Sequence, residues 1–162
     1  MYEPWASIGI EVDRRRVAAA AAALSERTSG RIEASCGSVL DMPYDDASFD
    51  LVFCKGVLHE VRRVDAAVAE MARVCRPGGA VCLIDISRIS RVRFEAYRWC
   101  SWLRGRRTAD IFPGFARARV ERAMRRVGLE VERYELLPTT WRLGDTQVEP
   151  FLLRAVRRSA VP

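Results

Sequence analysis

A chain of 162 residues is long enough to bury one hydrophobic core and too short for two ordinary domains, so we expect a single domain over residues 1–162. Apolar residues make up 49% of the chain and charged residues 30%, which excludes a disordered or fibrous protein. The formal net charge of +6 comes from arginine and favours anionic partners only in a general way, because solvated helix faces are the better explanation for it.

Strands and helices alternate in the first third of the chain, which is typical of a mostly parallel sheet with helices on its faces. We predict a strand over residues 7–12 ("SIGIEV"), a helix over 14–27 that Asp13 caps, and a second strand within 31–40. After an acidic turn, the continuous apolar run of "FDLVFCKG" (49–56) predicts a strand that is covered on both faces.

The pattern continues with a helix from about Asp65, which we expect "RPGG" (76–79) to end because proline and glycine do not continue a helix. The run "AVCLIDIS" (80–87) predicts another fully buried strand. Residues 88–113 break the alternation, since they are basic and aromatic, and we interpret them as a lid or insertion segment.

The last third contains one more helix and two more strands. Apolar residues from Val120 to Val127 recur at helical spacing, and Gly128 ends that helix. The runs "LEVERYELL" (129–137) and "VEPFLLRAV" (148–156) predict the two final strands, so we expect six strands in all.

Cysteine and histidine usage argues against a metal site. The five cysteines have no C-x-x-C spacing and most lie in apolar runs, so we expect reduced, buried thiols, and His59 is the single histidine. No apolar run approaches the ~20 residues of a membrane span, and the first residues lack the pattern of a secretory signal. The predicted location is therefore the cytoplasm.

Three carboxylates fall at the ends of predicted strands: Glu11, Asp41 and Asp85. In an open parallel sheet, ligands bind at the carboxyl ends of the strands. A carboxylate there can accept hydrogen bonds from the hydroxyls of a ribose or from the amine edge of an adenine. For Asp45, Asp46 and Asp50, ordinary turn roles are a sufficient explanation.

The stretch "GSVLDMPYDDASFDLVFCKGVLHEV", followed by "AVAEMARVCRPGGAVCLIDIS", resembles the class I S-adenosylmethionine-dependent methyltransferases. It is most similar to the small-molecule group related to ubiquinone and menaquinone biosynthesis enzymes. The resemblance extends from "GIEVD" to "RPGGAVCLID". It implies a Rossmann-like three-layer α/β sandwich, whose mostly parallel sheet has an antiparallel last strand, with S-adenosylmethionine as cofactor.

By this resemblance, six residues occupy cofactor-binding positions: Glu11, Val12, Asp41, Met42, Cys54 and Lys55. Glu11 would hold the ribose hydroxyls while Val12 packs on the adenine. Asp41 would accept a hydrogen bond from the adenine amino group, with Met42 beside it. Cys54 and Lys55 would lie near the methionine half of the cofactor. A helix cap or a turn acceptor is the alternative explanation for Glu11 and Asp41.

The resemblance also suggests residues that contact the methyl acceptor. His59 stands where the family often has a histidine, and it would orient the acceptor or take a proton, although such a histidine also serves as a packing residue. Tyr97, Trp99 and Trp102 would cover a flat or apolar acceptor. The alternatives for this segment are an amphipathic helix packed on the edge of the sheet and docking at a membrane surface.

The family's first strand, with its D-x-G-x-G-x-G loop, has no counterpart here, because "SIGIEV" aligns with the second family strand. The absent strand lies in the family between the strands represented here by residues 7–12 and 49–55, so two rows of backbone groups need partners. Three arrangements supply them: a longer protein that begins upstream, direct pairing of the two neighbours, or a second chain in a homodimer.

The function implied is S-adenosylmethionine-dependent methylation of a small-molecule acceptor by direct displacement at the methyl group. The alternative is a catalytically inactive relative, or a truncated chain, that acts as a binding or regulatory partner. A nucleic-acid partner is disfavoured, since "CKGVLHE" stands where enzymes that methylate nucleic-acid amines carry N-P-P-Y or D-P-P-Y.

Overall fold

The computed structural model describes residues 7–11, 13–25, 32–105, 113–143 and 146–158. The chain divides into an N-terminal unit, Met1–Pro43, and a C-terminal unit, Tyr44–Pro162. Each unit is built around its own sheet.

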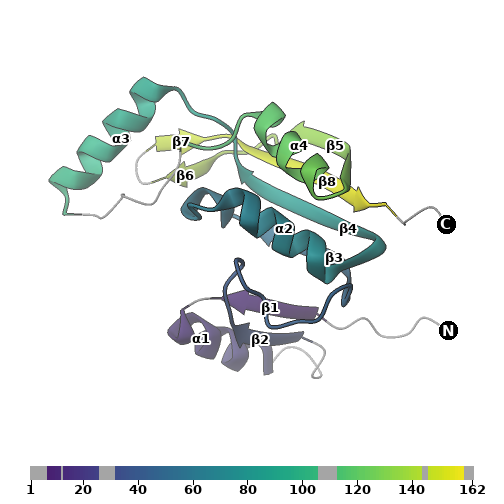
Figure 1. The fold of residues 1–162 in the computed structure, drawn as a ribbon. Coiled ribbons are helices and arrows are strands. Elements are labelled where there is room, and N and C mark those ends of the chain that lie inside the picture. The colour runs from purple at the N-terminus through teal and green to yellow at the C-terminus, as the bar shows by residue number, and fades with distance from the viewer. Residues whose placement is uncertain (1–6, 12, 26–31, 106–112, 144–145, 159–162) are drawn as a thin grey trace. The chain divides into compact units, whose positions relative to one another are not determined.

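The N-terminal unit is a strand–helix–strand element (Figure 1). Strands β1 (Ser7–Glu11) and β2 (Ile32–Cys36) pair in parallel, and helix α1 (Arg14–Ser25) makes the crossover that parallel neighbours require. The Asp13 carboxylate accepts the N–H of Arg15 at 2.8 Å, and its carbonyl accepts that of Val17 at 3.0 Å. The predicted cap at Asp13 is therefore confirmed.

The C-terminal unit contains a four-stranded sheet in the order β3–β4–β8–β5. These strands are β3 (Phe49–Lys55), β4 (Cys75–Ile86), β8 (Pro150–Arg157) and β5 (Leu129–Leu136). β3 runs parallel to β4, whereas β8 is antiparallel to both β4 and β5. The last strand is thus antiparallel, as predicted, and a short hairpin of β6 (Trp141–Leu143) and β7 (Thr146–Val148) was not anticipated.

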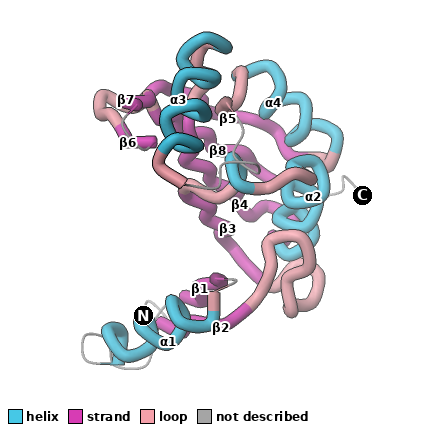
Figure 2. The backbone as a smooth tube through the Cα atoms, turned by 90° about the vertical axis from the view of Figure 1, so that its left-hand side faces the viewer, coloured by secondary structure: helices cyan, strands magenta, loops and turns pink. Residues whose placement is uncertain are grey.

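Helices α2 (Val64–Val74) and α4 (Arg117–Arg126) contact each other and lie on the same side of the four-stranded sheet (Figures 1 and 2). The short 3-10 helix η1 (Leu58–Glu60) follows β3, and α3 (Arg91–Leu103) follows β4. Among the described helices, none combines the length and apolar character needed to cross a membrane. The core of this unit contains Val68, Met71, Val81, Leu83, Met124, Leu129, Phe151 and Leu153.

Two strand predictions were wrong in their burial. β3 forms one edge of its sheet, and Leu51 and Phe53 on one of its faces are 56% and 57% exposed. In β4, Val81 and Leu83 are buried but the alternating Cys82 and Ile84 are only half-buried. A continuous apolar run predicts two covered faces, whereas α2 and α4 cover one face of this sheet.

Two further expectations need correction. "RPGG" does not follow the helix as a separate terminator: α2 ends at Val74, and β4 begins at Cys75 and runs through Pro77 and both glycines. The five cysteines are free, but Cys36 and Cys100 are exposed rather than buried.

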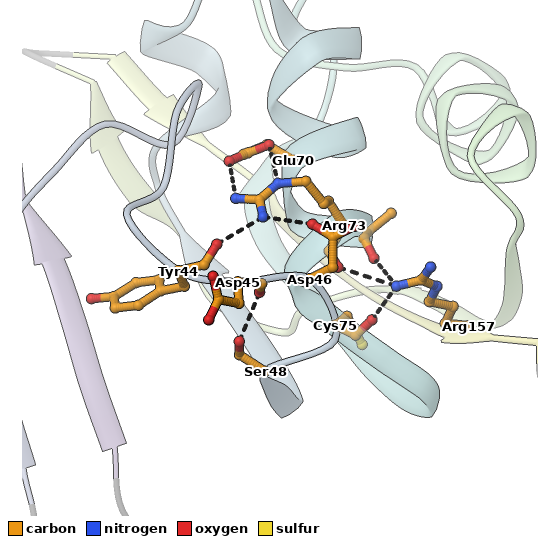
Figure 3. Close-up of polar contacts among 9 residues, drawn as sticks. Tyr44, Asp45, Asp46, Ser48, Glu70, Arg73, Cys75 and Arg157 are labelled. Carbon is orange, nitrogen blue, oxygen red and sulfur yellow. Dashed lines mark hydrogen bonds and ion pairs between the residues drawn. The ribbon is translucent and has the colours of Figure 1, made fainter.

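Two arginines of the C-terminal unit fix neighbouring backbone segments: Arg73 holds the acidic turn before β3, and Arg157 holds the junction of α2 with β4 (Figure 3). The Arg73 guanidinium donates to the Glu70 carboxylate at 2.6 and 2.9 Å, to the Tyr44 carbonyl at 2.7 Å and to the Asp46 carboxylate at 2.8 Å. Arg157 donates to carbonyl oxygens at the end of α2, those of Ala72, Arg73 and Cys75. Asp46 therefore anchors the turn, which agrees with a structural role for these carboxylates.

Candidate active site

The carboxyl ends of β3 and β4 lie side by side because the two strands are parallel and in register, with Lys55 opposite Ile84. Directly after β3, Gly56 has φ of 65°, a left-handed backbone that glycine adopts without strain, and its N–H donates to the Ile84 carbonyl at 2.8 Å. The chain then turns into η1. This turn brings His59 next to the last residues of β4.

His59 and Asp85 form a buried pair at this strand end. The His59 Nδ1 atom lies 2.8 Å from Asp85 Oδ1, and the two residues are 8% and 1% exposed. Asp85 also accepts the Leu58 N–H through Oδ2 at 2.9 Å and the Ile86 N–H through Oδ1 at 2.7 Å. Two backbone N–H groups donate to this carboxylate, so it is the acceptor of the cluster, and a hydrogen on Nδ1 of His59 would complete its hydrogen bonds.

Burial of the imidazole acts to lower the pKa of His59, but the hydrogen bond and charge of Asp85, with a smaller effect of Glu60, outweigh burial and raise that pKa above its ordinary value. The second ring nitrogen, Nε2, is 3.9 Å from a Glu60 carboxylate oxygen. The ring therefore has one nitrogen fixed by Asp85 and one left to exchange a proton, which is the arrangement of an oriented acid–base group.

Cys54 and Lys55 close the same strand end. Burial, reinforced by the charge of Asp85, raises the pKa of the Cys54 thiol to about 12, so this side chain is a neutral packing group and not a thiolate nucleophile. The Lys55 ammonium lies 5.8 Å from the centre of the Trp141 ring, a cation–π contact. Trp141 comes from β6, and no sequence pattern connected it with this site.

In the N-terminal unit, Glu11 and Asp41 follow the carboxyl ends of adjacent strands. Glu11 ends β1 and pairs with Cys36 at the end of β2, while Asp41 closes a turn in which its N–H donates to the Ser38 carbonyl at 3.1 Å. Val12 lies outside the described residues, and Met42 is buried beside the exposed Asp41.

The Glu11 side chain has contacts with its own helix start but remains half-exposed. Its Oε1 accepts the Asp13 N–H at 3.1 Å, and its Oε2 lies 3.6 Å from an Arg16 nitrogen. Each carboxylate oxygen can accept more than one hydrogen bond, so the group retains capacity for ribose hydroxyls. A half-exposed carboxylate at the end of β1 and an exposed one after β2 fit the donors of an adenosine, and the residues present are thus compatible with the predicted cofactor.

The aromatic residues predicted to cover an acceptor do not share one surface. Tyr97 is buried together with Phe94 on the inner side of α3. Trp99 and Trp102 are largely exposed, and their rings contact each other with centroids 5.5 Å apart. Residues 106–112 of the predicted lid segment lie outside the described part of the chain.

Solved structures define the class of fold. A putative methyltransferase from Bacillus halodurans aligns with 94% of this chain and 83% of its own, with a TM-score of 0.74 at 16% identity. An S-adenosylmethionine-dependent methyltransferase from Methanosarcina mazei aligns with 94% of this chain and 82% of its own, with a TM-score of 0.76 at 16% identity. The fold is therefore the Rossmann-like α/β fold of methyltransferases, as predicted.

Residues 2–83, about half of the chain, match the family described as methyltransferase domain, and the chain belongs to this family. The demethylmenaquinone methyltransferase of Roseiflexus castenholzii is 32% identical over 107 residues, which are 66% of this chain and 39% of that protein. A ubiquinone/menaquinone biosynthesis C-methyltransferase of Cupriavidus necator is 33% identical over 109 residues, covering 57% of this chain and 44% of that protein. The chain spans less than half the length of these curated relatives. The resemblance to S-adenosylmethionine-dependent enzymes of this group is confirmed.

Proposed function

We propose that this chain functions as an S-adenosylmethionine-dependent methyltransferase that methylates a small-molecule acceptor by direct displacement. The observation that carries the proposal is the placement of Glu11 and Asp41 at adjacent strand ends, inside the segment that matches the family. The bound cofactor would supply an electrophilic methyl group on a sulfonium. Direct transfer requires mainly that the acceptor atom be held close to that methyl group and aligned with it.

The cofactor-binding residues of the proposal are those predicted from the resemblance. Glu11 accepts hydrogen bonds from the ribose hydroxyls, and Asp41 accepts one from the adenine amine. The remaining four contribute packing and polar contacts: Val12, Met42, Cys54 and Lys55. As a neutral thiol, Cys54 contributes packing and takes no covalent part.

The acceptor that we propose is a carbon of a quinone-type ring, because the relatives carry the names demethylmenaquinone methyltransferase and ubiquinone/menaquinone biosynthesis C-methyltransferase. An aromatic carbon that gains a methyl group must lose a proton. His59 takes this proton on Nε2 while Asp85 holds the ring through Nδ1. We do not assign Trp99 and Trp102 to this acceptor site, because both are largely exposed on the side of α3 opposite the buried Tyr97.

The proposal includes a homodimer. Among the described residues, β3 pairs only with β4, so its outer edge offers unpaired backbone groups beside the exposed Leu51 and Phe53. An uncovered apolar edge strand readily adds another strand. A second copy of this chain would provide one in a symmetric interface.

The test is calorimetric titration of S-adenosylhomocysteine into the purified chain. We expect saturable one-site binding. Glu11→Gln keeps the shape and the oxygen that accepts the Asp13 N–H but removes the charge, and it should weaken binding about ten- to a hundredfold, since hydrogen bonds to a charged group contribute about 1.5–3 kcal/mol. Glu33→Gln, an exposed change within β2, is the matched control and should bind as the wild type does.

Equal affinity of the Glu11 and Glu33 variants would remove Glu11 from the cofactor site. Absence of binding by a chain that circular dichroism shows to be folded would contradict the proposed activity. That result would instead support the alternative of an inactive relative that acts as a binding partner.

A further inference from the structure

Helix α3 is fixed to the C-terminal unit by its inner side. Phe94, Tyr97 and Ser101 are buried there, the first two packed in a cluster that also contains Ile86, Ile89 and Val148. The Arg93 guanidinium donates to the Gln147 carbonyl at 2.7 Å, which ties the helix to the β6–β7 hairpin. Figure 1 shows α3 at the end of the C-terminal unit, next to this hairpin. Because these contacts fix α3, its opposite side faces away from the C-terminal unit.

That opposite side is apolar and exposed. Val92 is 80% exposed, Trp99 65%, Trp102 67% and Leu103 64%. With the exposed Ala96, the residues at positions 92, 96, 99 and 103 follow spacings of four and three, so they form one stripe along the helix. Single exposed apolar residues are common on proteins, but a continuous stripe of this kind marks an interaction surface.

Arginines border the stripe on both sides. At 100° per residue, Arg91 and Arg98 fall on one flank, and Arg93 and Arg104 fall on the other, where the Arg93 guanidinium is directed to the Gln147 carbonyl. Residues 91–104 contain these four arginines and a single acidic residue, Glu95, whose carboxylate pairs with Arg98 at 3.3 Å. The surface therefore combines a tryptophan-containing apolar stripe with a net positive border, and we call it the α3 outer face.

We propose that the α3 outer face docks onto an anionic lipid surface, with the stripe inserted between the headgroups and the flanking Arg91 and Arg98 in contact with the phosphates. A helix with bulky apolar residues on one side and arginines along its borders lies in the plane of such an interface. Tryptophan has an apolar ring and one N–H donor, which suits the boundary between headgroups and acyl chains. The positive border is complementary to the anionic headgroups.

The same features disfavour two other occupants. A second copy packed stripe against stripe would bring two sets of arginines together with few carboxylates to offset their repulsion. A single-stranded nucleic acid binds by stacking of its bases on aromatic rings, but Val92 and Leu103 provide no stacking surface. A lipid surface, by contrast, accommodates both the apolar stripe and the arginines of the α3 outer face. It adds a partner to the proposed methyltransferase, and its test does not depend on activity.

The test is co-sedimentation of the purified chain with vesicles of phosphatidylcholine mixed with phosphatidylglycerol. We expect binding that weakens with added salt, is much lower on phosphatidylcholine alone, and shifts tryptophan fluorescence to shorter wavelength. Trp99→Ser with Leu103→Ser should lower the partition coefficient by at least about tenfold, since two large apolar side chains no longer insert. Arg91→Gln with Arg98→Gln should lower it about thirtyfold, because each basic residue near an anionic surface contributes about 1 kcal/mol.

Leu136→Ser is the matched control, since Leu136 is 54% exposed on β5 and lies outside this face. Its partition should equal that of the wild type. Four results would overturn the proposal: no binding to the anionic vesicles, equal loss in the Leu136 control, oligonucleotide binding that requires Trp99 in place of vesicle binding, or a dimer that the change at Trp99 and Leu103 dissociates.

Discussion

The carboxylate of Asp85 has three hydrogen-bond partners, which come from η1 and from β4. These contacts explain why Asp85 can be buried and why His59 lies beside it. Two of its hydrogen bonds come from the turn after β3, those of Leu58 and His59, and the third comes from Ile86 of its own strand. A buried anion is stable only when it is paired and hydrogen-bonded. Asp85 therefore serves to hold the turn and to set the protonation of the imidazole.

The pH dependence of this pair follows from the raised pKa of His59. Its cause is the hydrogen bond and charge of Asp85, which outweigh burial. The folded chain thus binds this proton more tightly than the unfolded chain does. The stabilisation is fully present below about pH 6.5, the ordinary value, and is lost as pH rises through the raised pKa.

Asp85→Asn should lower the pKa of His59 below its ordinary value, because burial then acts without the carboxylate. Since His59 is the only histidine, an NMR titration reports its pKa from a single imidazole resonance. The substitution should also cost about 1–3 kcal/mol of unfolding free energy, because the amide offers donors to groups that themselves donate.

His59→Gln is the companion variant for this prediction. Urea unfolding of the wild type should show stability that falls with rising pH across the window above about 6.5, and the variant should lack that component. An unaltered His59 pKa in Asp85→Asn, or an identical pH profile in His59→Gln, would contradict the assignment of the shift to this pair.

Local residue roles were predictable from sequence where they depend on neighbours in the chain. Asp13 caps α1 and Gly128, with φ of 78°, ends α4, because both roles depend on adjacent backbone geometry. The link between His59 and Asp85 was not predicted, although both were singled out separately. It spans 26 residues and depends on the register of β3 with β4, which a single sequence does not fix.

At the scale of elements, the connection after β4 depends on one glycine. Gly114 has φ of 80°, and it lies where Phe115 pairs with Ser87 beyond the end of β4. The Phe115 N–H donates to the Ile86 carbonyl at 3.1 Å, and its carbonyl accepts the Arg88 N–H at 3.1 Å. A Cβ atom at Gly114 would overlap the Ser87 carbonyl oxygen and would lie 2.9 Å from that of Ile86.

Gly114→Ala should therefore destabilise the protein by two additive effects. The left-handed backbone costs about 1–2 kcal/mol for a residue with a Cβ atom, and the overlap with backbone adds about 1–3 kcal/mol. Gly105→Ala is the matched control: Gly105 also has positive φ, of 67°, but a Cβ atom there would meet no described residue within 4 Å apart from its chain neighbours, so only the first effect applies. Urea unfolding of both variants measures the difference, and equal losses would show that the close packing at Gly114 carries no cost.

Helices α1, α2 and α4 and most strands were predictable as elements because their sequence patterns are local, whereas α3 lies in the segment interpreted as a lid. The predictions that were wrong concern which faces of the strands are covered by other elements. β3 is as apolar as a central strand, yet Leu51 and Phe53 are exposed because the helices of this unit cover one face of the sheet. The two faces of α3 were likewise not distinguished, since aromatic residues occur on both: Tyr97 inside, Trp99 and Trp102 outside.

At the scale of the whole molecule, the resemblance fixed the class of fold but not how the strands are completed. The last strand, β8, is antiparallel to both β4 and β5, which matches the expectation from the resemblance. Within the described residues, β1 pairs only with β2, and β3 only with β4. How these edges are completed depends on pairing with segments far from them in sequence or in another chain, and such pairing leaves no periodic pattern in a sequence.

The proposed homodimer gives the last prediction. Sedimentation velocity at micromolar concentration should show a dimer of this chain, because the exposed edge of β3 gains backbone hydrogen bonds and buries Leu51 and Phe53 when it pairs with a second copy. Phe53→Lys should shift the chain to monomer without loss of secondary structure, since Phe53 is 57% exposed and a lysine on an edge strand opposes pairing.

Leu136→Lys, on the strand at the far edge of the same sheet, introduces the same charge at a residue of similar exposure and should leave the dimer intact. A wild-type monomer, or a dimer that persists in Phe53→Lys, would show that the edge of β3 is not closed by a second copy. Dissociation by Phe53→Lys alone would place the interface at this edge, because the two variants have equal net charge and carry the lysine on opposite edges of the sheet.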